Sequence, residues 1–107
     1  MDTAQIREII TQYLQTAHTA AYWFEDASAR AVMELIYRQD IWDGDFRARY
    51  PAVRDKQIPA MDAAEIRTVL TWIACMERTH EGTFDESIRS GRLEALLRRW
   101  LALLPRA

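Results

Sequence analysis

The sequence predicts an all-α fold, a compact bundle of four to five amphipathic helices in one domain over residues 1–107. Apolar residues recur at helical spacing in several segments, and no segment alternates apolar and polar residues as half-buried strands do. Glycine and proline number only three each, so few breaks interrupt the helices. A chain of 107 residues has the usual length of one domain and can bury about two-thirds of its unfolded surface.

Two helices are expected in the first third of the chain. Asp2 or Thr3 can cap the first helix, and Asp26 the second, because their side-chain oxygens accept from first-turn amides that lack a partner. The apolar stripe of the first helix consists of Ile6, Ile9, Ile10, Tyr13, Leu14 and Ala17. The stripe of the second consists of Ala29, Val32, Met33, Ile36 and Tyr37. Residues 20–24 either continue the first helix or bend it.

The segment from residue 35 to residue 50 is expected to be irregular. Aspartate and glycine in residues 40–45 favour turns and end the second helix. Residues 46–50 form a short helical turn, and residues 51–59, which are polar and bounded by prolines, form a loop. As an alternative, Leu35 and Tyr37 belong to a short strand.

A third helix begins at Asp62, which with Glu65 has the spacing of a capping box. Its apolar face consists of Ile66, Val69, Leu70, Trp72, Ile73 and Met76. Gly82 ends this helix by taking the left-handed conformation that other residues resist.

Two further helices complete the expected bundle. Thr83 and Glu86 repeat the capping-box spacing and open a short helix, which Gly91 interrupts. The last helix presents on one face Leu93, Leu96, Leu97, Trp100, Leu101 and Leu104, and Pro105 ends it. A homodimer through this leucine-rich face is one expected assembly, and a monomer is the other.

Residues 46–100 contain one ordered pattern of aromatic residues, leucines, glycines and arginines. An aromatic segment is followed by a leucine-rich helix, an E-R element, two glycines and a closing L-R-R-aromatic. The matching residues are Phe46, Tyr50, Leu70-Thr71, Glu77-Arg78, Gly82, Gly91 and Leu97-Arg98-Arg99-Trp100. In this pattern the C-terminal half resembles a bacterial family of unknown function. The resemblance implies a helical fold and transfers no activity, cofactor or site.

Several features predict a cytoplasmic location. The first residues show neither the basic region nor the apolar region of a signal peptide, so none is expected. No apolar run approaches the ~20 residues that cross a bilayer. The single cysteine, Cys75, excludes an internal disulfide. Arginine outnumbers lysine thirteen to one, which is typical of a GC-rich bacterial or phage genome.

The sequence contains no complete catalytic, nucleotide or metal motif, so we expect neither an enzyme nor a cofactor or metal protein. Glu77 and His80 form one E-x-x-H pair, whereas carboxylate-bridged di-metal sites need two such pairs. The aspartates near Gly44 lack calcium-loop spacing, since the position six residues later is Tyr50 rather than glutamate.

Charge is divided unevenly along the chain. Residues 1–45 contain three basic and eight acidic groups, and residues 46–107 contain eleven and eight. Carboxylates steer encounters with a basic surface, and aromatic side chains hold the contact. The candidate partner-binding residues, which combine both kinds of side chain, are Glu25, Asp26, Asp40, Trp42, Asp43 and Asp45. We therefore expect a non-enzymatic protein-binding module, most specifically a small bacterial or phage inhibitor that, like anti-CRISPR proteins, occupies a nucleic-acid-binding surface of its partner.

The basic part of the chain gives an alternative, a helix-turn-helix-like regulator with its turn at Gly82. Its candidate nucleic-acid-binding residues are Arg89, Arg92, Arg98 and Arg99. Arg106, seven residues after Arg99, would extend the same helix face. The net charge of −2 argues against this alternative, because phosphate neutralisation supplies much of the affinity for DNA.

Overall fold

The computed structural model describes residues 2–105, and all regular secondary structure in them is helical. These residues form six α helices: α1 (Thr3–Gln15), α2 (Ala27–Ile36), α3 (Phe46–Val53), α4 (Ala63–Thr79), α5 (Thr83–Arg89) and α6 (Arg92–Leu103). Two 3₁₀ turns, η1 (Trp23–Glu25) and η2 (Ile58–Ala60), lie in the connections. The predicted all-α bundle is confirmed. The short strand considered at Leu35 and Tyr37 is not formed, because Leu35 lies inside α2 and Tyr37 caps its end.

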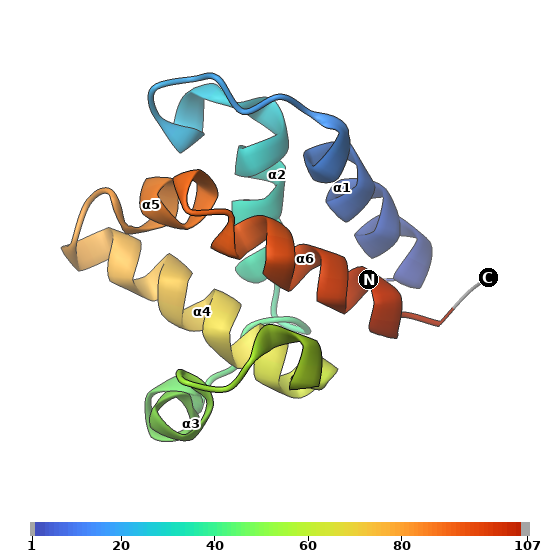
Figure 1. Cartoon of the computed structure of the whole chain (residues 1–107), viewed down its shortest axis with the longest axis vertical. Coiled ribbons are helices and arrows are strands. Elements are labelled where there is room, and N and C mark those ends of the chain that lie inside the picture. Colours follow the sequence, from blue (N-terminus) through green and yellow to red (C-terminus); the bar gives the residue numbers. More distant parts are fainter. Residues whose placement is uncertain (1, 106–107) are drawn as a thin grey trace.

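Helix α6 lies across the middle of one face of the bundle (Figure 1). It contacts α1 on one side, α4 on the other, and also α5 and η2. The predicted apolar face of the helix points into the core, where Leu93, Leu96, Leu97 and Trp100 are buried. Leu103 is 37% exposed. The leucine face considered for a homodimer is therefore largely covered within the chain.

Local capping signals position three of the helices as predicted. Asp2 accepts from the N–H of Gln5 at 2.9 Å and starts α1. Asp26 accepts from the N–H of Ala29 at 3.1 Å and starts α2. The capping box of α4 is complete, since the Asp62 and Glu65 side chains each accept from the other's backbone N–H.

The start of α5 differs from the prediction, because Thr83 is not its cap. Gly82 occupies the cap position, and the Thr83 hydroxyl donates instead to the carbonyl of His80 at 2.7 Å. The Glu77 carboxylate of α4 caps α5 instead, because it accepts from the N–H of Phe84 at 2.8 Å and from the N–H of Gly82 at 3.3 Å. A side chain of the preceding helix therefore satisfies amides that the first turn of α5 leaves unpaired.

Two glycines make the sharp connections between α4, α5 and α6. Gly82 has φ +100° and Gly91 has φ +81°, the left-handed region that favours glycine. The prediction that these glycines separate the last three helices is confirmed, and each also occupies the cap position of the helix that follows.

The loop expected over residues 51–59 is shorter than predicted. Helix α3 continues through Pro51 to Val53, because the carbonyl of Tyr50 still accepts from the N–H of Arg54 at 2.9 Å. The proline removes its own donor and crowds the preceding turn, while the buried side chain of Val53 packs the last turn into the core. Among the helices of residues 2–105, none has the length and apolar character needed to cross a membrane.

Candidate protein-binding groove

Residues 22–25, which we name the aromatic turn, follow α1 in the chain and lie against α5. The backbone N–H of Trp23 donates to Oδ1 of Asp85 at 2.7 Å. The Trp23 ring meets Phe84 edge to face, with ring centroids 5.4 Å apart. Asp85 is only 9% exposed, and Phe84 is fully buried. The turn is thus fixed to a helix that lies about sixty residues later in the sequence.

The aromatic turn presents two stacked rings to solvent. Tyr22 and Phe24 lie with centroids 5.3 Å apart and planes 2° from parallel. Among residues 2–105 they are the most exposed large apolar side chains, at 52% and 49%. Exposed aromatic clusters on a soluble domain often mark a contact surface, whereas single exposed apolar side chains are ordinary.

A hollow of about 410 Å³, the aromatic groove, opens between the aromatic turn, α2, α4 and α5. Its apolar walls consist of Trp23, Phe24, Met33, Tyr37 and Ala74. Its charged side chains are Glu77, Arg78, Glu81 and Asp85. Four separate elements therefore build a site that combines aromatic rings with three carboxylates.

The three carboxylates of the groove differ in their surroundings. Glu77 holds the start of α5, and Asp85 holds the aromatic turn. Glu81 is exposed and makes no hydrogen bond or ion pair with any residue from 2 to 105. Two carboxylates thus fix the walls, and Glu81 remains available to a cationic ligand.

Arg78 lies against the Tyr37 wall of the groove. Its Nε donates to Oη of Tyr37 at 2.8 Å, and its Cζ lies 4.8 Å from the centroid of the Tyr37 ring. The ring of Tyr37 stacks in turn on Trp42, with centroids 4.8 Å apart. The groove therefore already holds one guanidinium against an aromatic face.

A second hollow, of about 240 Å³, shares Trp23 and Asp85 with the aromatic groove and is also lined by His18. One ring nitrogen of His18 lies 2.6 Å from Oδ2 of Asp26, and the other lies 2.8 Å from the carbonyl of Tyr13. Burial raises the pKa of Asp26, but hydrogen bonds from His18, Ser28 and the Ala29 N–H outweigh it and leave the pKa lowered. Burial, aided by Asp26 and Glu94, raises the pKa of the Tyr13 phenol, which stays neutral. These contacts tie the chain that enters the aromatic turn to α1 and α2.

The structure divides the carboxylates predicted from sequence between the two ends of α2. Glu25 and Asp26 lie at its start, beside the aromatic turn. The predicted residues of the other group, which follow the end of the helix, are Asp40, Trp42, Asp43 and Asp45. A helix of ten residues separates the groups by roughly 15 Å at 1.5 Å per residue. The acidic residues therefore do not form one continuous face.

Asp43 is the member of this set whose surroundings differ most from those of a surface carboxylate. It is 6% exposed, and it accepts from the Thr68 hydroxyl at 2.6 Å and the Asp45 N–H at 2.9 Å. Burial raises its pKa, but the bonds from Thr68 and Asp45 and the nearby Arg49 and Arg67 leave the pKa lowered. Asp43 therefore joins the 40–45 turn to α4, whereas Asp40 and Asp45 remain exposed.

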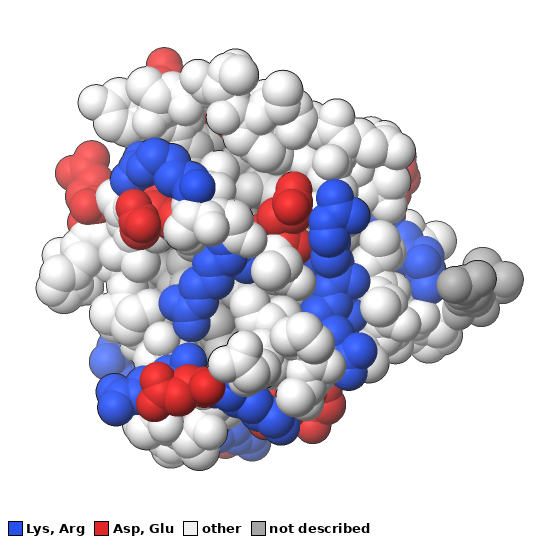
Figure 2. Space-filling model, in the orientation of Figure 1, with Lys and Arg blue, Asp and Glu red and all other residues white. Residues whose placement is uncertain are grey.

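The arginines of the alternative, DNA-binding prediction lie among acidic partners. Arg89 pairs with Glu86 at 3.3 Å, and Arg98 pairs with Glu94 at 3.7 Å. Nε of Arg99 donates to the carbonyl of Met61 at 3.0 Å and so fastens α6 to the connection before α4. Figure 2 shows basic and acidic side chains mixed on the face that α6 crosses. The side chain of Arg92 is partly buried, and Arg106 lies outside the described residues.

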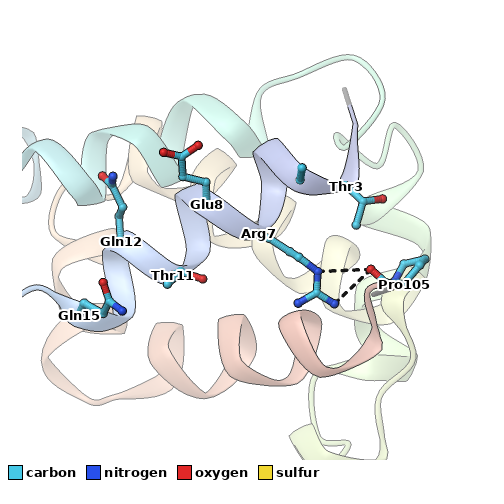
Figure 3. Close-up of a pocket in the computed structure, with 8 residues that line it drawn as sticks. Thr3, Arg7, Glu8, Thr11, Gln12, Gln15 and Pro105 are labelled. Carbon is cyan, nitrogen blue, oxygen red and sulfur yellow. Dashed lines mark hydrogen bonds between the residues drawn. The ribbon is translucent and has the colours of Figure 1, made fainter. Parts of the chain in front are cut away.

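Another hollow, of about 660 Å³, follows the outer surface of α1 (Figure 3). It is lined by residues of one helix, most of them polar or charged in type, and by Pro105. Arg7 points from this helix toward Pro105, while Glu8 and Gln12 point to the opposite side. The Arg7 guanidinium donates to the carbonyls of Leu104 and Pro105, which ties α1 to the end of α6. The lining residues of this surface include no aromatic ring and one carboxylate, Glu8, whereas the aromatic groove combines aromatic rings with three carboxylates.

Neither pattern considered for metal binding forms a site in the part of the chain that the structure describes. Residues 2–105 contain no group of three or more His, Cys, Asp and Glu side chains that could hold a metal ion. The Glu77 carboxylate is occupied at the start of α5, and His80 is the exposed cap residue at the end of α4. Cys75 is partly buried, 3.7 Å from a guanidinium nitrogen of Arg47.

Of the residues predicted from sequence, Glu25 lies in the aromatic turn and Asp26 directly follows it, whereas Tyr22, Glu81 and Asp85 were not among the predicted residues. The signal that could have suggested Glu81 and Asp85 is the cluster of carboxylates on both sides of Gly82. Their meeting with the aromatic turn is tertiary, so no local pattern shows it.

The comparisons with known proteins agree with the sequence resemblance. No curated protein and no solved structure matches the chain. A family model matches residues 11–106, which extends well beyond the half that carried the resemblance. Glu77 of the E-R element and the two glycines of that resemblance form the α4–α5–α6 connections described above. The chain belongs to DUF6508, a family of unknown function.

Proposed function

We propose that this chain is a non-enzymatic protein-binding module and that the aromatic groove with the aromatic turn is its contact surface. The observation that carries the proposal is the exposed Tyr22–Phe24 stack, held in place by the bond between Asp85 and Trp23. Aromatic side chains dominate the binding energy at interfaces. A contact fixed before binding also loses little conformational entropy when the partner arrives.

Charge favours a basic partner surface. Four carboxylates, Asp26, Glu77, Glu81 and Asp85, line the groove and the neighbouring hollow, against two arginines, Arg78 and Arg89. Glu25, in the aromatic turn itself, adds an exposed carboxylate. Negative potential around an aromatic contact speeds the encounter with a basic protein and disfavours acidic ones.

In its sharpest form, the proposal makes the partner a nucleic-acid-binding complex of a bacterium or phage, in the cytoplasm. The chain would then act as an inhibitor, as anti-CRISPR proteins do, by covering a basic surface that otherwise binds phosphates. Support comes from the complementarity between such surfaces and the carboxylates of the groove. In this form the chain, added to its partner, lowers the partner's nucleic-acid binding. A partner that binds nucleic acid equally well with and without the chain contradicts it.

Paired baits test the proposal. Tagged wild-type chain, the double variant Tyr22→Ala/Phe24→Ala and the control variant Leu103→Ala, which truncates an exposed apolar side chain on α6, are each incubated with a nuclease-treated bacterial lysate, and retained proteins are quantified by mass spectrometry. The proposal expects a protein that the wild type and Leu103→Ala retain and the double variant loses. Equal retention by the folded double variant would overturn the groove as the contact surface.

DNA binding by a helix-turn-helix-like regulator is the second candidate. The observation that favours it is the succession of α4, α5 and α6 through two left-handed glycines, with Arg98 exposed on the last helix. It expects a gel shift at low salt that Arg92→Glu/Arg98→Glu abolishes, since phosphate contacts depend on these charges. The absence of any shift at low salt eliminates it.

A further inference from the structure

We infer that the aromatic groove recognises an arginine side chain of the partner protein, and that Arg78 occupies this arginine subsite in the free chain. The inference rests on the proposed function and specifies the chemistry of its central contact. It also makes Arg78 an internal competitor of the partner.

The first argument is the position of Arg78 itself. Its guanidinium lies over the Tyr37 ring with Cζ 4.8 Å from the centroid, and its Nε bonds to the Tyr37 hydroxyl. A planar guanidinium stacks on an aromatic face while its N–H groups remain free to donate at the edge. The groove therefore offers the surroundings that a guanidinium requires, and one of the chain's own arginines uses them.

The second argument is that Arg78 leaves the site incompletely used. No carboxylate among residues 2–105 lies within 4.0 Å of its guanidinium nitrogens, although Glu81 lines the same groove. A guanidinium binds most strongly where it combines aromatic stacking with a charge-assisted bond to a carboxylate. A partner arginine that stacks on the Tyr37 ring in place of Arg78 and also reaches Glu81 would make both contacts.

The third argument is that Arg78 is easily displaced. Its side chain is exposed on the last turn of α4, so it can return to water without leaving a buried charge. Displacement also removes the repulsion between two positive charges in one hollow. Binding of a partner arginine is therefore expected to be weaker in the wild type than in a chain that lacks Arg78.

The test uses fluorescent peptides of alternating arginine and glycine, with lysine–glycine and citrulline–glycine peptides for comparison. Affinities are measured by anisotropy at low salt for the wild type, Arg78→Ala and Glu81→Gln. Arg54→Ala and Glu8→Gln remove the same charges from exposed positions outside the groove and serve as matched controls. Circular dichroism establishes that each variant is folded.

We expect Arg78→Ala to bind the arginine peptide about threefold more tightly than Arg54→Ala does, the size of an exposed cation–π contact. Glu81→Gln is expected to bind it about threefold more weakly than Glu8→Gln, the size of one exposed ion pair. Lysine and citrulline peptides are expected to bind more weakly than the arginine peptide. In the wild type, the Arg78 Nε–H resonance shifts as the arginine peptide is added.

Two results would overturn the inference. If Arg78→Ala binds the arginine peptide no more tightly than Arg54→Ala does, Arg78 does not occupy the subsite. Equal affinity for arginine and lysine peptides excludes guanidinium recognition. If either result is obtained while a partner is still captured through Tyr22 and Phe24, the arginine inference fails and the proposed function stands. If no such partner is captured and no peptide binds, both fail.

Discussion

Asp85 of α5 accepts a 2.7 Å hydrogen bond from the backbone N–H of Trp23. This bond attaches the aromatic turn to α5. The pair brings together two parts of the chain that are far apart in sequence. Because the carboxylate is nearly buried, the bond is protected from competition by water. The position of the exposed Tyr22–Phe24 stack depends on it.

Removing the Asp85 carboxylate is expected to release the aromatic turn. Asp85→Ala leaves the Trp23 N–H without its acceptor and lowers the free energy of unfolding by about 1–3 kcal/mol. Asp85→Asn keeps an acceptor oxygen and loses less. Urea unfolding measures the stability, and hydrogen exchange measures the protection of the Trp23 amide. Glu86→Gln, at the exposed neighbouring position, is the control. An unchanged Trp23 exchange rate in Asp85→Ala would show that the bond does not hold the turn.

The two left-handed glycines should resist substitution where a third glycine does not. Gly82→Ala and Gly91→Ala place a Cβ at positive φ and are each expected to destabilise the chain by about 1–2 kcal/mol. A Cβ at either position, or at Gly44, meets no atom within 4 Å, so the loss comes from the backbone rather than from a clash. Gly44→Ala, at ordinary φ, is expected to be nearly neutral in thermal unfolding. Equal losses at all three positions contradict this account.

Acid should unfold the chain through Asp26 and Asp43. The pKa of each carboxyl is lowered in the folded chain below its ordinary value of 3.8. The unfolded chain therefore binds protons more readily, so their contribution is complete above about pH 5 and declines as pH falls through and below 3.8. Urea unfolding between neutral pH and about pH 3 is expected to show this decline.

The variant Asp43→Asn isolates one of the two contributions. It is expected to be less stable than the wild type at neutral pH and to lose less stability on acidification. Asp55→Asn, which changes an exposed carboxylate, is the control and should follow the wild-type curve. A wild-type decline that Asp43→Asn reproduces in full would assign the acid sensitivity to other groups.

The parts of the fold that could be predicted from sequence are those fixed by nearby residues. Asp26 and Asp62 cap helices through amides two or three positions away, so their spacing is visible in the sequence. The start of α5 was mispredicted because its amides are satisfied by Glu77, a side chain of another helix. Pro51 was expected to end a helix because proline removes a donor, but α3 continues through it to Val53, whose side chain is buried in the core.

The candidate site was predictable only where its residues are consecutive. Glu25 and Asp26 adjoin the aromatic residues in the sequence, which drew attention to the aromatic turn beside the groove. Glu81 and Asp85 reach it through the packing of α5, which no local pattern encodes. The burial of Asp43 was hidden for a related reason, since an aspartate on an exposed turn and one bonded to Thr68 have the same sequence signature.

The most direct test of the groove as a protein-binding surface is the affinity of wild-type chain and Tyr22→Ala/Phe24→Ala for the captured partner, by isothermal titration calorimetry. We expect the double variant to lose at least about 100-fold in affinity, since central aromatic contacts contribute 2 kcal/mol or more each. Its melting temperature should match that of the wild type, because both rings are exposed. Unchanged affinity in the folded double variant, or a loss only in Arg92→Glu/Arg98→Glu, would contradict the account.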